Sequence, residues 1–279
     1  MRRGTGSLYR RALSLRFLLG RDRAAVLSFL RAPYPVPLGL GQRLALVRRF
    51  VTTTNHVRTY HTQAEMLEVA DRILRLAGRP GLTVVEAGSG KGGSTAKLSL
   101  VTRLAGGRLV VFDSFRGIPA NREMHRNLWG RPVEFRAGAF RGRLPSVRRV
   151  VARFGAPEVC EFRKGWFADT MPAFGGHVDV ALLDVDLLSS TCTCLVRLVP
   201  RLRPGGVVFT QDGHLQAVVE MLGNARFWRD EVGVDPPVIR GLGSTKLLAI
   251  EAPSCDGSRI DASSVLPDLH EGHYREGGG

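Results

Sequence analysis

Short apolar runs alternate with helix-like stretches along most of this 279-residue chain. Runs typical of buried strands occupy residues 82–86, 108–112, 159–163, 178–183 and 205–210. Helix-like stretches lie between or after them, at residues 94–104, 146–154, 188–202 and 214–230. Two final apolar runs, 237–240 and 245–251, are joined by Gly241-Leu242-Gly243, which is typical of a hairpin turn.

This alternation predicts the fold class. Consecutive strands that are joined through helices lie parallel in one sheet, with helices on both of its faces. The closing hairpin adds an antiparallel strand at the edge. We therefore expect an α/β fold with a doubly wound, mostly parallel seven-stranded sheet of the Rossmann-like type. Ahead of the first strand, Met66, Val69, Ile73 and Leu76 are spaced as one face of a further helix.

Both ends of the chain differ in composition from this central part. Residues 1–32 are basic and helix-like, and Pro33, Pro35 and Pro37 form a stiff break after them. We predict a basic helical N-terminal arm over residues 1–50, one domain over 51–252 and a disordered tail over 253–279. The arm either docks on a membrane surface or partner, or packs on the chain's own core or a neighbouring subunit as a homo-oligomer contact. Its apolar positions form no clean stripe, which favours packing.

The net charge of +15 is concentrated in two places. Residues 1–50 hold 11 Arg against one acid, and residues 114–144 hold seven Arg against two Glu. The remainder is close to neutral, which argues against a dedicated nucleic-acid-binding domain, where a basic face is built into the fold. No apolar run approaches the roughly 20 residues that a transmembrane helix needs. The four cysteines lack metal-ligand spacing, so we expect reduced thiols in a cytoplasmic protein.

Residues 114–144 form a long stretch without periodicity. Such stretches in a compact domain are usually lids, binding elements or disordered. Four aromatic residues argue against disorder, namely Phe115, Trp129, Phe135 and Phe140. We interpret the stretch as a lid over the reactive end of a cofactor. Its arginines, Arg126 and Arg131 among them, favour an anionic or highly polar small-molecule acceptor.

The most informative motif begins where the first strand ends. Glu86 closes the apolar run, a glycine-rich turn leads from Gly88 to Ser94, and Asp113 closes the second apolar run. This order of elements binds adenosine-containing cofactors, because the glycines admit the ligand to the backbone and the carboxylate accepts hydrogen bonds from ribose hydroxyls. The cofactor-binding candidates in this unit are Glu86, Gly88, Gly90, Ser94, Asp113 and Ser114.

Glu86 helps to decide between two adenosine cofactors. A carboxylate two residues before the first glycine opposes the pyrophosphate of NAD, but it suits the sulfonium and ammonium cations of S-adenosylmethionine. We therefore expect S-adenosylmethionine. An NAD-dependent reductase is a weaker alternative, and a plain strand-to-helix turn without a ligand stays open.

A second group of polar residues follows two later strands. Asp184 and Asp186 come after residues 178–183, and Gln211, Asp212 and His214 come after the run that ends at Thr210. Because parallel strands deliver their carboxyl ends to one edge, these side chains can converge near the transferable methyl group. Such oxygen ligands make a Mg²⁺ or Mn²⁺ site plausible, in which a carboxylate or His214 takes the acceptor's proton. The alternative is that some of these acids cap helices, and for Asp186 the two interpretations are evenly balanced.

Three further residues have two interpretations each. Trp166 follows the third strand and either covers an adenine face or belongs to the core. His56 and His61 precede the first strand and either enter the site or serve a structural role.

Several sequence segments, taken together, resemble the macrocin O-methyltransferase-like family, which contains macrolide sugar O-methyltransferases. The likeness runs from about His61 to Ile250. It is carried by Val85-Glu86-Ala87-Gly88, Phe112-Asp113-Ser114-Phe115-Arg116-Gly117-Ile118-Pro119, Lys164-Gly165-Trp166-Phe167-Ala168-Asp169-Thr170-Met171-Pro172, Leu183-Asp184-Val185-Asp186-Leu187 and Pro204-Gly205-Gly206-Val207.

The resemblance implies a class I methyltransferase fold, S-adenosylmethionine, a divalent metal and methyl transfer to a hydroxyl. It implies that Glu86 and Gly88 line the methionine part, that Asp113 holds the ribose and that Trp166 lies near the adenine. It also implies that Asp184 is a metal ligand and possible base, with a further ligand from Gln211-Asp212. Family members often have two adjacent acids at that pair, so Gln211 lowers the negative charge of the site and puts the metal in doubt.

We predict an S-adenosylmethionine-dependent O-methyltransferase that acts on a hydroxyl of a polar small molecule, such as a sugar or glycosylated secondary metabolite. The predicted catalytic residues are Asp184 and His214, and the predicted metal ligands are Asp184, Gln211 and Asp212, with Mg²⁺ as the metal. The alternative from another class is a non-catalytic binding or scaffold protein on the same fold.

Overall fold

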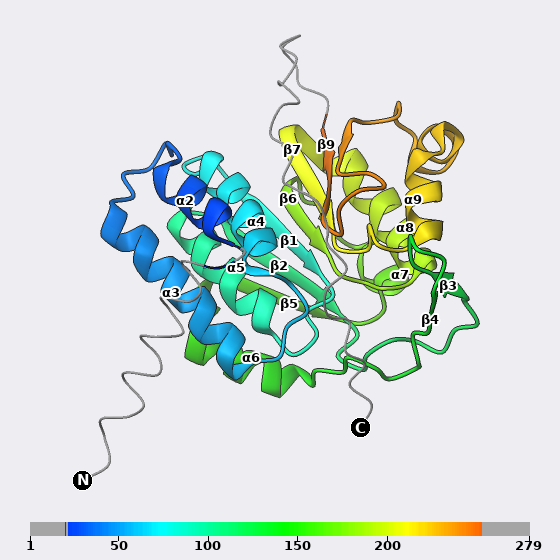
Figure 1. The fold of residues 1–279 in the computed structure, drawn as a ribbon, viewed down its shortest axis with the longest axis horizontal. Coiled ribbons are helices and arrows are strands. Elements are labelled where there is room, and N and C mark those ends of the chain that lie inside the picture. The colour runs from blue at the N-terminus through cyan, green and yellow to red at the C-terminus, as the bar shows by residue number, and fades with distance from the viewer. Residues whose placement is uncertain (1–19, 21, 253–279) are drawn as a thin grey trace.

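The computed structural model describes residues 20 and 22–252, drawn as a coloured ribbon in Figure 1. Its helices are α2 (Arg23–Arg31), α3 (Leu40–His56), α4 (Gln63–Arg75), α5 (Gly93–Leu104), α6 (Leu144–Phe154), α7 (Phe167–Thr170), α8 (Leu188–Leu198) and α9 (Gln216–Gly223). Its strands are β1 (Thr83–Ala87), β2 (Arg108–Asp113), β3 (His125–Arg126), β4 (Pro132–Val133), β5 (Cys160–Lys164), β6 (Val178–Leu183), β7 (Leu202–Thr210), β8 (Ile239–Arg240) and β9 (Leu248–Glu251). The predicted disordered tail and the first part of the predicted arm lie outside the described residues.

One seven-stranded sheet organises the described part of the chain, in the order β5-β2-β1-β6-β7-β9-β8. The five strands from β5 to β7 in this order are mutually parallel, and β9 runs antiparallel to both β7 and β8. Strands β3 and β4 form a separate small hairpin. The predicted α/β class with a mostly parallel sheet and an antiparallel edge is confirmed.

The sheet is covered on both faces, as Figure 1 shows, with α2 to α6 on one side and α7 to α9 on the other. Side chains alternate between the two resulting cores, so that Val84 faces the first and Val85 the second. Both faces of the central strands are therefore buried. This explains why these strands read as continuous apolar runs rather than as alternating ones.

The described part of the predicted arm packs on the chain's own core. Val26 and Phe29 of α2 and Phe50 of α3 are buried in the first core. Arg43 joins the two helices, because its guanidinium donates to the carbonyl oxygens of Leu30, Ala32 and Leu38. Residue 50, where the arm was predicted to end, lies inside α3.

Two predicted helices end earlier than expected. The helix predicted over residues 188–202 stops at Leu198, because Pro200 cannot donate a helical hydrogen bond, and a short 3-10 turn leads into β7. The helix predicted over 214–230 breaks at Asn224, whose side chain accepts from the backbone N–H of Arg226, and a π-helical turn follows. Every helix in the described residues is too short or too polar to cross a lipid bilayer.

Replacing Phe29 with Ala tests whether α2 belongs to the folded core. Phe29 is 2% exposed, so its removal leaves a cavity and should lower the free energy of unfolding by about 3 to 5 kcal/mol. Leu27→Ala is the matched control, because Leu27 lies on the same helix and is 36% exposed. Urea denaturation measures both variants, and equal effects would contradict the packing of α2.

Candidate active site

The polar residues singled out in the sequence lie at one edge of the sheet. Strands β1, β2, β6 and β7 run parallel, so the loops that follow them open at the same side. In parallel α/β sheets this carboxyl edge is where ligands bind. The glycine-rich loop and the acidic loops are therefore neighbours.

The glycine-rich loop touches the acidic loop directly at Gly88. Gly88 has φ +86°, and a Cβ atom there would lie 2.0 Å from the carbonyl oxygen of Asp184. Only glycine combines this left-handed conformation with so close an approach. Gly90 also has positive φ, at +47°, so two of the predicted cofactor-binding glycines adopt conformations that other residues avoid.

Glu86 lies fully buried beneath this loop. Its Oε2 atom accepts from Thr95 Oγ1 at 2.5 Å, while its Oε1 atom has no protein partner. Burial raises the pKa of Glu86 to about 8, and the hydroxyls of Ser94 and Thr95 only partly oppose this. An unpartnered buried carboxylate oxygen fits a cationic ligand group or a bound proton.

Asp113 is held by the chain's own donors. Its Oδ2 accepts from the backbone N–H and the hydroxyl of Ser89, at 2.7 and 2.9 Å, and its Oδ1 accepts from the N–H of Phe115 at 2.5 Å. Since a carboxylate offers about four acceptor sites, room remains for one ribose hydroxyl, or for two if the Ser89 hydroxyl turns away. The hydroxyl of Ser114 is used locally, where it accepts from the N–H of Arg116.

Of the three remaining candidate residues, two lie at this edge of the sheet and one does not. Trp166 is half-buried at the end of β5, next to Gly165, whose N–H donates to the carbonyl oxygen of Asp113. His61 enters the site, with its Nε2 atom 3.2 Å from Asp184 Oδ2. His56 lies elsewhere, where its ring packs on Phe154 at 5.2 Å.

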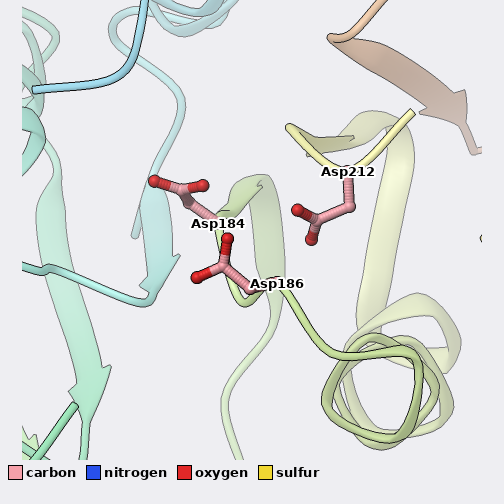
Figure 2. Close-up of side chains that lie close together, drawn as sticks. All are labelled: Asp184, Asp186 and Asp212. Atoms are coloured by element: carbon pink, nitrogen blue, oxygen red, sulfur yellow. The ribbon is translucent and has the colours of Figure 1, made fainter. Parts of the chain in front are cut away.

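Three aspartates form an acidic cluster at the ends of β6 and β7. Asp184 and Asp186 follow β6 and Asp212 follows β7, and one carboxylate oxygen of each lies within 4.8 Å of the others (Figure 2). Asp186 is a non-glycine residue with φ +63°, an unusual conformation that often marks a functional site. Its convergence with the other two acids favours a role in the site over helix capping.

The pKa values of the three acids are shifted in different directions. Burial and the charges of Asp184 and Asp212 raise the pKa of Asp186 well above its usual value. Burial and Asp184 raise the pKa of Asp212 to about 7. Burial acts on Asp184 in the same sense, but His61, Lys246 and His214 outweigh it and lower the pKa of Asp184.

Gln211 and His214 complete this side of the site. Gln211 is fully buried, and neither its Oε1 nor its Nε2 atom has a hydrogen-bond partner. His214 Nδ1 lies 3.3 Å from the carbonyl oxygen of Gln211. Burial and the charge of Lys246 lower the pKa of His214 to about 4, so its imidazole is neutral at pH 7.

The donor set of the acidic cluster fits a hard divalent cation. Asp212 Oδ1 is buried without a partner, and Gln211 Oε1 is a second orphaned oxygen. Mg²⁺ and Mn²⁺ prefer such oxygen ligands. The observed carboxylate cluster also includes Asp186. The predicted metal ligands were Asp184, Gln211 and Asp212, so the prediction omitted this residue.

Residues 114–144 contact both sides of this edge. Gly142 lies so close to the glycine-rich loop that a Cβ atom on it would be 1.7 Å from the carbonyl oxygen of Gly90. The N–H of Leu128, in the β3–β4 hairpin, donates to the carbonyl oxygen of His214 at 3.0 Å. Arg126 donates to the carbonyl oxygen of Gly130 within its own hairpin.

Sequence reasoning missed two charged residues at this edge. Lys246 precedes β9 and affects the pKa of all three acids, and Glu123 bonds to the first turn of α8. Neither belongs to a recognisable motif. Both act across contacts between residues far apart in the sequence, so no local signal was available.

Comparison with known proteins places the chain in a family. Residues 60–240 match the family model described as Macrocin-O-methyltransferase (TylF). The chain belongs to this family. The predicted resemblance is thereby confirmed, and the family supports the predicted methyltransferase activity.

One curated relative is an enzyme of Streptomyces olivaceus, the 8-demethyl-8-(2,3-dimethoxy-alpha-L-rhamnosyl)-tetracenomycin-C 4'-O-methyltransferase. It is 34% identical over 178 residues, which are 58% of this chain and 62% of the relative. The match thus spans less than two thirds of that enzyme.

Two solved structures share the fold. The O-methyltransferase NovP has a TM-score of 0.58 and 20% identity over 74% of this chain and 96% of its own. The calicheamicin methyltransferase CalS11 has a TM-score of 0.53 and 18% identity over 82% of this chain and 90% of its own. Both confirm the class I methyltransferase architecture.

Replacing Glu86 with Gln isolates the pH dependence of the buried carboxyl. Because the pKa of Glu86 is raised from 4.5 to about 8, the folded state keeps a proton that the unfolded state releases in this interval. Glu86 therefore lowers the stability of the wild type progressively as the pH rises from 4.5 to about 8. We expect the free energy of unfolding of Glu86→Gln, relative to wild type, to be larger at pH 8 than at pH 5.

Urea denaturation at both pH values makes this measurement. Glu134→Gln is the control, because the Glu134 side chain is 72% exposed. The difference in the free energy of unfolding between Glu134→Gln and wild type should be the same at both pH values. A pH-independent difference for Glu86→Gln would contradict the raised pKa.

Proposed function

We propose that this chain is an S-adenosylmethionine-dependent O-methyltransferase that methylates a sugar hydroxyl of a glycosylated secondary metabolite. The observation that carries the proposal is the meeting of the glycine-rich loop with the acidic cluster at Gly88 and Asp184, in a chain of the TylF family. The acceptor class is supported by the S. olivaceus relative, whose name describes methylation of a rhamnosyl group. The free thiols of Cys160, Cys192 and Cys194 support the cytoplasmic location.

On the donor side, each candidate has a distinct task. Gly88 and Gly90 admit the ligand to the backbone, and Glu86 offers its unpartnered oxygen to the positively charged methionine portion. Asp113 accepts from the ribose, with Ser89 already aligned on the same carboxylate. Trp166 covers the adenine from the end of β5. Methyl transfer is an in-line displacement, so this binding acts mainly by orientation and by exclusion of water.

On the acceptor side, the positions and pKa shifts of Asp184, His61 and His214 indicate the role of each residue. Asp184 lies against the glycine-rich loop, and its lowered pKa keeps it ionised at neutral pH, so it serves as the proton acceptor for the sugar hydroxyl. His61, 3.2 Å away, orients it. The neutral imidazole of His214 is a second acceptor for the same proton.

Asp184, Asp186 and Asp212 would hold Mg²⁺, with Gln211 Oε1 as a neutral further oxygen. When bound, the cation polarises the acceptor hydroxyl and lowers its pKa.

Calorimetry with S-adenosylmethionine tests the donor site. We expect Asp113→Ala to weaken binding at least about tenfold, because a charged hydrogen-bond acceptor for the ribose is lost. Asp230→Ala, at an exposed position, should bind like the wild type. Absence of binding by the wild type would reject the donor assignment.

Transfer of a labelled methyl group tests the acceptor site. The acceptor probes are a rhamnosylated tetracenomycin and a nucleotide-linked rhamnose. We expect Asp184→Asn to lower kcat about 10³-fold, as loss of a general base does, while the Kd for S-adenosylmethionine stays unchanged. Asp235→Asn is the control, because Asp235 is 97% exposed. EDTA treatment followed by Mg²⁺ addition measures the metal requirement.

The same assay separates the alternatives. Binding of S-adenosylmethionine by the wild type, without transfer to any glycosylated acceptor of the source cell, would favour the non-catalytic scaffold. Equal kcat for Asp184→Asn and wild type would reject Asp184 as the base.

A further inference from the structure

Helix α8 begins without a capping residue of its own. The residue before it is Leu187, whose side chain cannot accept a hydrogen bond, so the first backbone N–H groups of the helix need another partner. Glu123 provides it from 65 residues upstream. Its carboxylate accepts from the N–H of Leu188 at 2.8 Å and from the N–H of Ser189 at 3.3 Å, and it also bonds the Ser189 hydroxyl.

Glu123 is itself held in place by the segment that carries it. Its N–H donates to Asn121 Oδ1 at 3.1 Å, and the Asn121 amide donates to the carbonyl oxygen of Phe135 at 3.0 Å. His125 Nε2 lies 3.1 Å from Glu123 Oε2, and the buried His125 ring packs edge-on against Phe135 at 5.3 Å. The carboxylate is therefore fixed by the fold of residues 121–135 and is not a chance surface contact.

The helix turn that Glu123 caps directly follows the acidic loop. Asp186 is two residues before Leu188, and its φ of +63° is disfavoured for a residue with a side chain. Such a conformation persists only where its surroundings fix it. One side is fixed by the end of β6, where the Asp184 N–H donates to Ala87. The other side is the first turn of α8, which begins after a tight turn from Val185 to Leu187.

We propose that Glu123 is a positioning residue, which caps α8 from the 114–144 segment and thereby holds Asp186 beside Asp184 and Asp212. The inference rests on the proposed role of the acidic cluster in acceptor activation. It adds that the cluster is complete only when residues 121–135 are docked on α8. Docking of this segment, which also contacts His214 through Leu128, is thus coupled to the geometry of the acids.

The deciding measurement needs no acceptor. Amide hydrogen exchange and the three-bond HN–Hα coupling are recorded by NMR for wild type, Glu123→Ala and Glu123→Gln. In Glu123→Ala we expect the Leu188 and Ser189 amides to exchange at least about tenfold faster, as loss of a cap predicts, and the coupling of Asp186 to depart from its left-handed value. Glu123→Gln keeps one acceptor oxygen and should show a smaller change. Glu134→Gln, in the same segment but exposed, should match the wild type.

Kinetics test the functional consequence with the acceptor that the wild type methylates. We expect kcat of Glu123→Ala to fall about tenfold while the KM for S-adenosylmethionine is unchanged, and Glu123→Gln to recover part of the loss. Unchanged exchange at Leu188 and Ser189, or an unchanged Asp186 coupling, would overturn the proposal. A kcat of Glu123→Ala equal to that of Glu134→Gln would also overturn the proposal.

A parallel pair of variants separates this inference from the proposed function. If Asp184→Asn and Asp186→Asn lose turnover while Glu123→Ala keeps it, only the positioning role is wrong. If both aspartate variants keep full turnover, the acidic cluster itself is not the acceptor site.

Discussion

The site depends on the close approach between Gly88 and the backbone of Asp184. The N–H of Asp184 donates to the carbonyl oxygen of Ala87 at 3.0 Å, and a Cβ atom at residue 88 would overlap the Asp184 carbonyl oxygen. This main-chain contact joins the ends of β1 and β6. The glycine-rich loop follows β1, and the acidic loop follows β6. The distance between these loops is therefore set by backbone atoms and not by the charged side chains.

The crowding of three carboxylates shifts their pKa values in different directions. Like charges in a buried site cannot all ionise, so the pKa values move apart. Of the three acids, Asp184 lies 3.2 Å from His61 Nε2 and its pKa is lowered, whereas the pKa values of Asp186 and Asp212 are raised. The raised pKa values of Asp186 and Asp212 favour proton binding at these two acids over Asp184.

Most of the fold, and the placement of the glycine-rich loop at the carboxyl edge of the sheet, could be predicted, because both are encoded locally. Apolar runs of four to six residues mark strands that are buried on both faces, and strand ends locate the polar loops. The glycine spacing alone was not decisive, since Gly88, Gly90 and Gly93 also match the G-x-G-x-x-G pattern of dinucleotide sites, and Glu86 carried the choice. The capping of α8 by Glu123 could not be predicted, because a hydrogen bond across 65 residues leaves no periodicity in the sequence.

Residues 114–144 contact the carboxyl edge of the sheet at two places. Gly142 lies against Gly90 of the glycine-rich loop, and the N–H of Leu128 donates to the carbonyl oxygen of His214. The segment also presents exposed side chains in and beside the β3–β4 hairpin, Met124 at 96% and Trp129 at 52%. These side chains contribute little to the core, so their substitution should not disturb the glycine-rich loop. Under the proposed function, this exposed part of the segment is where acceptor preference can vary without a change at the acidic cluster.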